Sequence, residues 1–383
     1  MPYWSIDLLY AISLFVCATR AELDTHARRL VCAQVISVAC FLLFPLRFTF
    51  ERPPVDGAFG FMFDVLAGFD QPYNQAPSLH IALLVILWVL YSRHVAGPWR
   101  WLLHGWFALI GISILTTWQH HFIDLPTGIW VGWLSVWLFP DEGESLLAKA
   151  RWSTEPRRRV LALRYAMGAV LVGAIAIGVG GWGWWLMWVT GALALIAAIY
   201  LMFDEGAFQK RGDGSMRPAS WWLFAPYFAG AWLNSRWWTR GVAPADVIVP
   251  GLLFGRLPRP AEREALGVAA TVDLTAELPF GSPGTHYANV AQLDLTPPTP
   301  EQLACSVQAI DHAFARGPAL VCCALGFSRS AAAVAAWLLA SGHARDVAEA
   351  IAQVRSARRG VVLGPAYAEA LERYARKLEE RQA

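Results

Sequence analysis

The amino-acid sequence predicts a polytopic α-helical membrane domain of about seven transmembrane helices, followed by a cytoplasmic α/β domain. Hydrophobic residues make up 56% of the 383 residues and charged residues only 16%, a composition typical of a chain that faces lipid. Long apolar segments fill the first half, whereas short apolar strands alternate with helical periods from about residue 244. We therefore expect a membrane domain at 1–210, an interfacial linker at 211–243 and an α/β domain at 244–383.

Seven apolar segments of the first half are candidates for membrane spans, since a crossing helix needs ~20 mostly apolar residues for a ~30 Å hydrocarbon core. They lie near 3–18, 29–46, 79–96, 101–118, 121–139, 160–180 and 183–203. The first segment is short, which leaves open whether a further helix precedes it. It lacks a basic leading region and an obvious small-residue cleavage site, so we expect no cleavable signal peptide.

Basic residues orient these segments, because Lys and Arg concentrate in cytoplasmic loops. Most of them fall in alternate loops at 19–29, 92–100 and 141–159, whereas the other loops hold only Arg47 and Arg52 beside acidic residues. The C-terminal domain is therefore expected in the cytoplasm, as part of a multi-pass protein of the inner (plasma) membrane. The six cysteines show no disulfide-rich pattern, which agrees with a reducing compartment.

The linker contains the tryptophan-rich stretch "SWWLFAPYFAGAWLNSRWW" at 220–238. Tryptophan is enriched at membrane–water interfaces, so this stretch predicts a helix that lies on the inner leaflet. An eighth span is the alternative, but it would move the C-terminal domain outside.

The C-terminal domain combines short strands with amphipathic helices. Strands are predicted near 246–255, 269–273, 290–294 and 319–323, and helices near 300–315, 328–341, 345–356 and 365–380. Thr299 followed by Pro300 is a typical helix start. Alternation of this kind indicates a compact α/β domain.

The stretch "ALVCCALGFSRSAAAV" places a strand, Cys323, Arg329 and a helix in that order. Backbone N–H groups and a helix N-terminus then point at one place, which forms an anion site. Arg329 can hold two phosphate oxygens and favours the thiolate of Cys323, which can attack phosphorus. Asp294 follows another strand and is a candidate general acid. Ser330 can assist loss of phosphate from the sulfur.

Residues from about 244 resemble the dual-specificity phosphatases of the protein tyrosine phosphatase superfamily. Their signature His-Cys-x-x-Gly-x-x-Arg-Ser is matched by Cys323, Gly326, Arg329 and Ser330, with Cys322 in place of the histidine. The resemblance implies phosphomonoester hydrolysis through a phosphocysteine, on a phosphoprotein or a soluble phosphomonoester. The remaining loop positions are apolar, which favours a substrate with a single phosphate.

A second group of polar residues falls at the opposite membrane face. "NQAPSLHIAL" carries Ser78 and His80, and "TTWQHHFIDLPTG" carries His120 and Asp124, an i, i+4 pair expected on one helical face. A carboxylate one turn from an imidazole fixes its tautomer. Ionisable residues at membrane depth are functional by default.

These residues resemble the type 2 phosphatidic acid phosphatase superfamily over about 30–140, and in particular its inositolphosphotransferase-like branch. The resemblance implies that His120 is the nucleophile, that Asp124 orients it and that His80 protonates the leaving group. Substrate phosphate would be bound by Arg47, Arg52 and Ser78. Ile114 stands where many members have an arginine.

Together these patterns predict a membrane-bound bifunctional phosphatase that acts on phospholipid or lipid phosphate at the outer face. Two alternatives stay open: a lipid head-group (inositolphosphate-type) phosphotransferase, or one domain that is a non-catalytic phosphate-binding module. We expect no metal and no cofactor. The net charge of +2 and the absence of basic runs with interleaved aromatics give no indication of nucleic-acid binding.

Overall fold

The computed structural model describes residues 2–50, 55–69, 73, 75–281 and 286–382. The chain forms two compact units, Met1–Ala150 and Arg151–Ala383.

The first unit is helical. It contains α1 (Pro2–Val16), α2 (Arg20–Leu43), α3 (Gly57–Phe69), α4 (Leu79–His94), α5 (Trp99–Thr116), α6 (Asp124–Leu138) and the short α7 (Leu146–Lys149). Helix α4 is the most buried of these and packs against α1, α2, α5 and α6. Helix α3 lies in a segment for which the sequence predicted only a loop.

Two glycines let α6 approach α4 closely. A Cβ atom at Gly128 would lie 2.5 Å from the Ser78 carbonyl oxygen, and one at Gly132 would lie 2.7 Å from the Val85 Cβ. Small residues four apart on one face allow such contact between apolar helices. The start of α4 and the start of α6 are thereby brought together.

Each of the seven apolar segments contains a helix in the structure. Among the described residues, three helical stretches are long and apolar enough to cross a membrane: Arg20–Leu43, Pro156–Val179 and Gly181–Met202. Helices α1 and α4 are apolar but shorter. The count of seven spans therefore stays a prediction.

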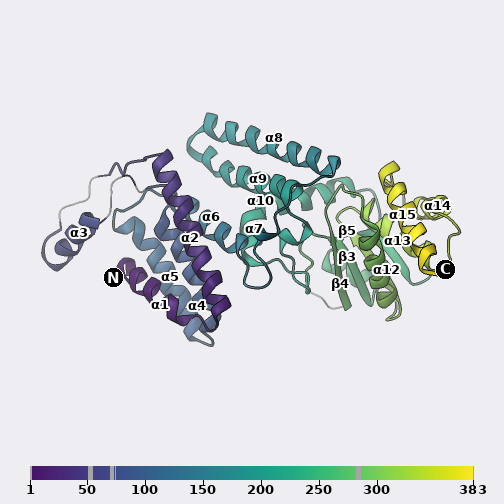
Figure 1. The fold of residues 1–383 in the computed structure, drawn as a ribbon, viewed down its shortest axis with the longest axis horizontal. Helices are drawn as coiled ribbons and strands as arrows, with labels where there is room; N and C mark the ends of the chain where they lie inside the picture. The colour runs from purple at the N-terminus through teal and green to yellow at the C-terminus, as the bar shows by residue number, and fades with distance from the viewer. Residues whose placement is uncertain (1, 51–54, 70–72, 74, 282–285, 383) are drawn as a thin grey trace. The chain divides into compact units, whose positions relative to one another are not determined.

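The second unit begins with a helical hairpin, in which α8 (Pro156–Val179) and α9 (Leu186–Met202) lie side by side (Figure 1). The two helices are joined by the 3-10 helix η1 (Gly181–Trp185). Arg158 closes the other end, because its guanidinium donates to the carbonyl oxygens of Ile199, Tyr200 and Phe203. A cation at free carbonyl groups stabilises a helix C-terminus.

A short 3-10 helix η2 (Glu205–Phe208) then leads to α10 (Pro218–Trp238), which stays one helix although it contains Pro226. Helix α10 coincides with the predicted interfacial helix. Five of its tryptophans are at least two-fifths exposed: Trp221, Trp222, Trp232, Trp237 and Trp238.

A five-stranded sheet follows, with strands β1 (Ala245–Val249), β2 (Leu252–Arg256), β3 (Ala270–Thr275), β4 (His286–Gln292) and β5 (Ala319–Cys323). Their order is β1-β2-β5-β3-β4, and only β1 runs antiparallel to its neighbour. The single strand predicted at 246–255 is in fact the β1–β2 hairpin, because Gly251 turns the chain with a φ of +86°.

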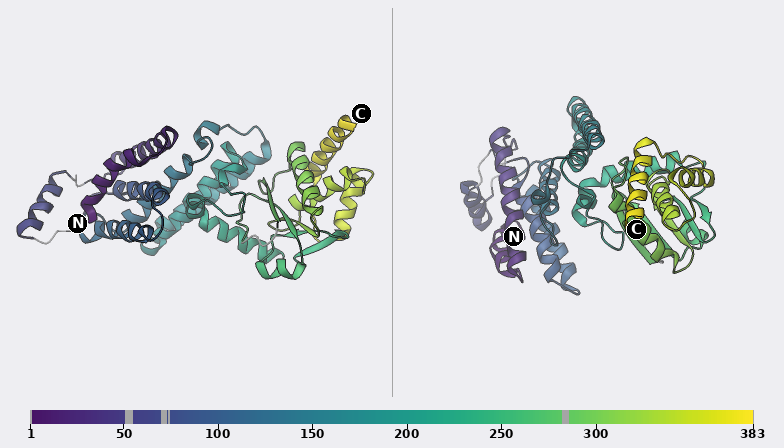
Figure 2. Two further views of the ribbon diagram at one scale, coloured as in Figure 1. Left: turned by 90° about the horizontal axis from the view of Figure 1, so that it is seen from below. Right: turned by 45° about the vertical axis from the view of Figure 1, so that its right-hand side comes forward.

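Helices α12 (Pro300–Phe314), α13 (Arg329–Ala340), α14 (Val347–Ala357) and α15 (Pro365–Gln382) cover one face of the sheet. In both views of Figure 2 the yellow C-terminal helix lies beside the green helices of this layer. The sequence predicted these four helices but missed α11 (Pro260–Leu266).

Alternation along β5 assigns its side chains to opposite faces. Val321 and Cys323 belong to the core under α12–α15, whereas Leu320 and Cys322 belong to the core of the other face, where Ala231 of α10 also packs. Cys323 is the last residue of β5, so its sulfur lies at the carboxyl edge of the parallel strands.

Candidate active site

The loop between Cys323 and Arg329 is fixed by its central glycine. Gly326 has a φ of +79°, and a Cβ atom there would lie 2.3 Å from the Gly255 carbonyl carbon. Only glycine combines this backbone conformation with such a close approach. The loop therefore turns tightly against β2 and directs its N–H groups inward.

The Cys323 sulfur is buried and has two neighbours that can donate to a thiolate. The Gly326 N–H lies 3.2 Å from Sγ, and the Ser330 hydroxyl oxygen lies 3.4 Å from it. Both predicted residues are thus brought to the sulfur. Helix α13 begins directly after the loop, at Arg329, so its N-terminus faces the same place.

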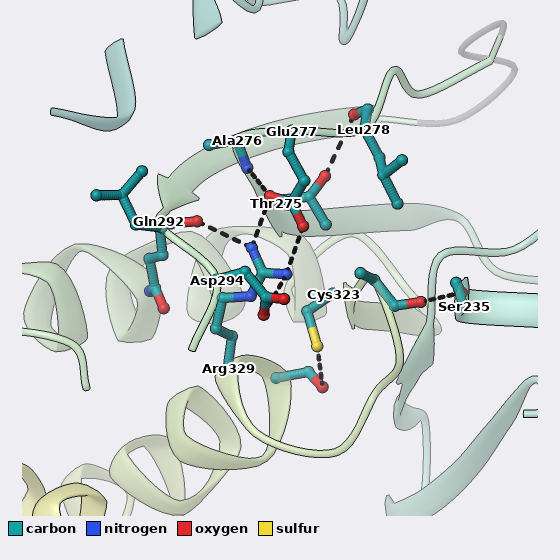
Figure 3. A network of polar contacts seen from close by, with 12 residues as sticks. Ser235, Thr275, Ala276, Glu277, Leu278, Gln292, Asp294, Cys323 and Arg329 are labelled. Carbon is teal, nitrogen blue, oxygen red and sulfur yellow. Dashed lines mark hydrogen bonds and ion pairs between the residues drawn. The ribbon is translucent and has the colours of Figure 1, made fainter. Parts of the chain in front are cut away.

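The Arg329 guanidinium is buried and held by two carboxylates (Figure 3). It donates to both Glu277 carboxylate oxygens, at 2.9 and 2.6 Å, and to the Gln292 carbonyl oxygen at 2.9 Å. The Asp294 Oδ1 lies 3.0 Å from Nη2. Within the described part of the chain, Nε is buried without a hydrogen-bond partner, which leaves a donor for a phosphate oxygen.

The pKa values of the two carboxyl groups beside Arg329 are shifted in opposite directions. Burial raises the pKa of Asp294; Arg329 opposes this shift and Glu277 adds to it. Burial acts on Glu277 in the same sense, but the charge and hydrogen bonds of Arg329 prevail and lower its pKa. Glu277 is therefore the ionised partner of Arg329, and Asp294 is the group suited to carry a proton.

Two residues of this site, Glu277 and Arg358, were not predicted from the sequence. Glu277 follows β3, and only the pairing of β3 with β5 brings it beside Arg329. Arg358, fully buried, donates from Nε to the Gly326 carbonyl oxygen at 3.0 Å and pairs with Asp246. The basic "RSARRG" at 355–360 was the available signal, but it gave no indication of a contact.

Cys322 stands where the phosphatase signature has histidine, and it belongs to the face of the sheet opposite to that of Cys323. Burial raises the pKa of its thiol well above the ordinary range, and the charge of Asp273 adds to this shift. Asp273 is itself paired with Lys210 of the linker, which also donates to the Thr275 carbonyl oxygen at 3.0 Å. Cys322 is thus a neutral core residue.

Two helices of the same unit contact the site from outside the sheet. The Ser235 hydroxyl of α10 donates to the carbonyl oxygen of Ala324, inside the loop. The Tyr200 hydroxyl of α9 donates to the Asp294 carbonyl oxygen at 2.9 Å. Leu295, the next residue, has a φ of +58°, which a non-glycine residue seldom adopts. The position of Asp294 therefore depends on α9.

The first unit contains a separate polar chain of three predicted residues. The Ser78 hydroxyl oxygen lies 3.2 Å from Nε2 of His120, and Nδ1 of His120 lies 3.2 Å from Oδ2 of Asp124. All three are buried. A carboxylate that accepts from Nδ1 fixes the tautomer in which Nε2 can react.

The prediction that His120 and Asp124 share a helical face was wrong, because α6 begins only at Asp124. Pro126 is tolerated only in the first turn of a helix, so the helix starts shortly before it. The pair still meets, since the Asp124 carboxylate accepts the His121 N–H at 2.9 Å and turns the chain back.

Among the described residues, no hydrogen bond or ion pair joins the other predicted residues of this unit to that chain. The His80 ring is stacked on Tyr3 with ring centroids 4.4 Å apart. Arg47 is exposed. Arg52 lies outside the described residues. Across the described ranges, no group of three His, Cys, Asp or Glu side chains could hold a metal ion.

No family model matches the chain. Over about a third of its length it is similar to solved protein tyrosine and dual-specificity phosphatases. Tk-PTP in the active form is 25% identical, covering 35% of this chain and 97% of its own, with a TM-score of 0.32. PTPMT1 in complex with PI(5)P is 22% identical, covering 37% and 99%, with a TM-score of 0.33. Human DUSP28 is 25% identical, covering 36% and 99%, with a TM-score of 0.33.

Proposed function

We propose that the second unit hydrolyses phosphomonoesters through a phosphocysteine on Cys323. The observation that carries this proposal is the arrangement of Arg329, held by Glu277, between the Cys323 loop and the Asp294 carboxyl. A planar guanidinium fixed in this way is pre-organised for phosphate oxygens.

In the first step the Cys323 thiolate attacks phosphorus, and an S–P bond forms while the P–O bond to the leaving alcohol breaks. Asp294 gives its proton to the leaving oxygen. Water then attacks phosphorus, Asp294 takes a proton from that water, and the S–P bond breaks. The products are the alcohol, inorganic phosphate and the thiolate, which accepts hydrogen bonds from Ser330 and Gly326.

The test uses the purified full chain in detergent with para-nitrophenyl phosphate as substrate. The Cys323→Ser variant should release no phosphate above background, and rapid acid quench of the unsubstituted chain should trap phosphate on Cys323. Hydrolysis by Cys323→Ser at the original rate would refute the proposal.

We also propose a second activity for the first unit, favoured by the Ser78–His120–Asp124 chain. His120 would carry a phosphohistidine and act on a lipid phosphate at the outer membrane face, with Ser78, Arg47 and Arg52 binding the phosphate. Transfer to an alcohol acceptor instead of water is the alternative outcome. The other alternative is that the first unit binds phosphate without catalysing a reaction.

Labelled phosphatidic acid in mixed micelles distinguishes these outcomes in a Cys323→Ser background. Loss of labelled phosphate release on adding His120→Ala supports hydrolysis. His120-dependent formation of labelled inositol phosphate, with release of diacylglycerol, in the presence of inositol supports transfer. If neither product depends on His120, the second activity is wrong.

For the whole chain we propose the multi-pass inner-membrane location with the Cys323 site in the cytoplasm.

A further inference from the structure

An apolar cavity lies beside the Cys323 loop, within the second unit. Its volume is about 700 Å³, in the range of ~300–1,000 Å³ usual for small-molecule sites. Leu325, Phe327 and Ser328 of the loop line one end of it together with Asp294. A ligand that fills the cavity therefore reaches the loop and the proposed general acid.

Much of the remaining lining comes from apolar helices. Tyr165 of α8, Val189 and Leu193 of α9, and Tyr227 and Gly230 of α10 line them. Helix α8 and the stretch Gly181–Met202 are long and apolar enough to cross a membrane. On α8 the cavity is lined by Arg157 and Tyr165, eight residues apart, which corresponds to about 12 Å along the helix axis. The cavity thus extends well along membrane-type helices.

Charge is distributed unevenly over this cavity. Among the described residues that line it, only Arg157 and Asp294 are charged. The anion site formed by Arg329 and the N-terminus of α13 adjoins two residues of the lining, Ser328 and Asp294. Ala324, Leu325 and Phe327 supply no cation for a second phosphate. The complementary ligand has one phosphate group on a long apolar body.

Two hydrogen bonds join helices that line the cavity to the backbone of the site. Ser235 of α10 donates to the loop carbonyl of Ala324, and Tyr200 of α9 donates to the Asp294 carbonyl. The wall helices therefore position the site as well as enclose its approach.

We propose that the substrate of the Cys323 site is a lipid phosphomonoester, which enters from the membrane through this cavity. The proposal rests on the phosphatase function proposed above. The reaction is the same: the ester P–O bond breaks, Asp294 protonates the lipid alcohol, and inorganic phosphate leaves. The product is the neutral lipid alcohol.

The experiment uses the full chain with His120→Ala, in mixed micelles, so that the first unit does not contribute. Phosphate release is measured from dioleoyl phosphatidic acid, from glycerol 3-phosphate, from para-nitrophenyl phosphate and from a phosphotyrosine peptide. We expect kcat/KM for the lipid to exceed that for glycerol 3-phosphate by about 100-fold or more, because binding of the apolar body contributes to catalysis.

Gly230→Trp is the diagnostic variant. Gly230 lines the cavity, and an added Cβ atom there meets no atom within 4 Å. Gly178→Trp is the matched control, since Gly178 is an exposed helical glycine of α8 with equally open surroundings. We expect Gly230→Trp to lower kcat/KM for the lipid about tenfold or more and to leave para-nitrophenyl phosphate hydrolysis unchanged. Gly178→Trp should change neither.

Hydrolysis of the lipid no faster than glycerol 3-phosphate, or more slowly than the peptide, would overturn the proposal. The proposal would also be overturned if Gly230→Trp slowed hydrolysis of the lipid and of para-nitrophenyl phosphate equally, or slowed neither. The Cys323→Ser variant distinguishes failure of the lipid proposal from failure of the phosphatase proposal. Activity that survives this substitution refutes the phosphatase function of Cys323. Activity that depends on Cys323 but shows no preference for the lipid refutes only the lipid proposal.

Discussion

The two candidate sites differ in how the chain holds the cation that would bind phosphate. In the second unit Arg329 is 1% exposed and fixed by Glu277, Asp294 and a backbone carbonyl oxygen. In the first unit the Ser78–His120–Asp124 chain is buried, but Arg47 is exposed. In the second unit the fold fixes the charges around Arg329, whereas in the first unit only the His120 ring is oriented, by Asp124. Pre-organised donors contribute most to catalysis, so substitutions should affect the two sites unequally.

The largest expected effect is at the proposed general acid. Asp294→Asn should lower kcat for para-nitrophenyl phosphate by about 10²- to 10⁴-fold, because the leaving oxygen loses its proton donor. The raised pKa of Asp294 keeps it protonated to higher pH than an ordinary aspartate. Activity should therefore fall as pH rises through this pKa, and the fall should be absent from the Asn variant.

The control for this prediction is Asp124→Asn, the same substitution in the other unit. It should leave the pH profile of the Cys323 reaction unchanged. A normal alkaline limb in Asp294→Asn would show that another group donates the proton.

The second effect tests the cations directly. Arg329→Lys should lower kcat/KM at the Cys323 site by about 10²- to 10³-fold, because an ammonium cannot replace the bidentate fork. Arg47→Lys, assayed with phosphatidic acid in Cys323→Ser, should change the rate only a few-fold. Equal losses of activity from the two substitutions would contradict the difference proposed between Arg329 and Arg47.

The third effect concerns the loop. Gly326→Ala should destabilise the protein by about 3 kcal/mol, since the alanine is strained at positive φ and also collides with β2. Gly342 has a similar φ of +74° but open space around an added Cβ atom. Gly342→Ala should therefore cost only about 1 kcal/mol. Thermal unfolding of both variants in detergent measures the difference; similar melting temperatures would contradict the role of the β2 contact.

The smallest effect sharpens the role of α9. Tyr200→Phe removes the hydrogen bond to the Asp294 carbonyl oxygen, worth about 1 kcal/mol. We expect kcat to fall about fivefold with KM unchanged, because the acid is misplaced while phosphate binding is kept. Tyr165→Phe, on the neighbouring helix α8, is the comparison. A change in KM alone would indicate that Tyr200 acts on substrate binding.

Local sequence patterns were sufficient for the parts of the fold and site that depend on neighbours in the chain. Cys323, Gly326 and Arg329 fall in one strand–loop–helix unit, so their arrangement follows from that unit's geometry. Glu277 and Arg358 could not be predicted, since they reach the loop through strand pairing and helix packing. His120 was misplaced for a related reason: a periodic spacing does not reveal that Pro126 delays the start of α6.

The buried pair of Lys210 and Asp273 has a consequence for how this chain can be divided. The lysine belongs to the segment between α9 and α10, yet its charge is neutralised inside the sheet, where both side chains are almost inaccessible. Cutting the chain before residue 244 would strand an aspartate in the protein interior, at a cost of several kcal/mol. The sheet and its helices therefore do not form a separable domain, and the segment that precedes the sheet is part of the same folding unit.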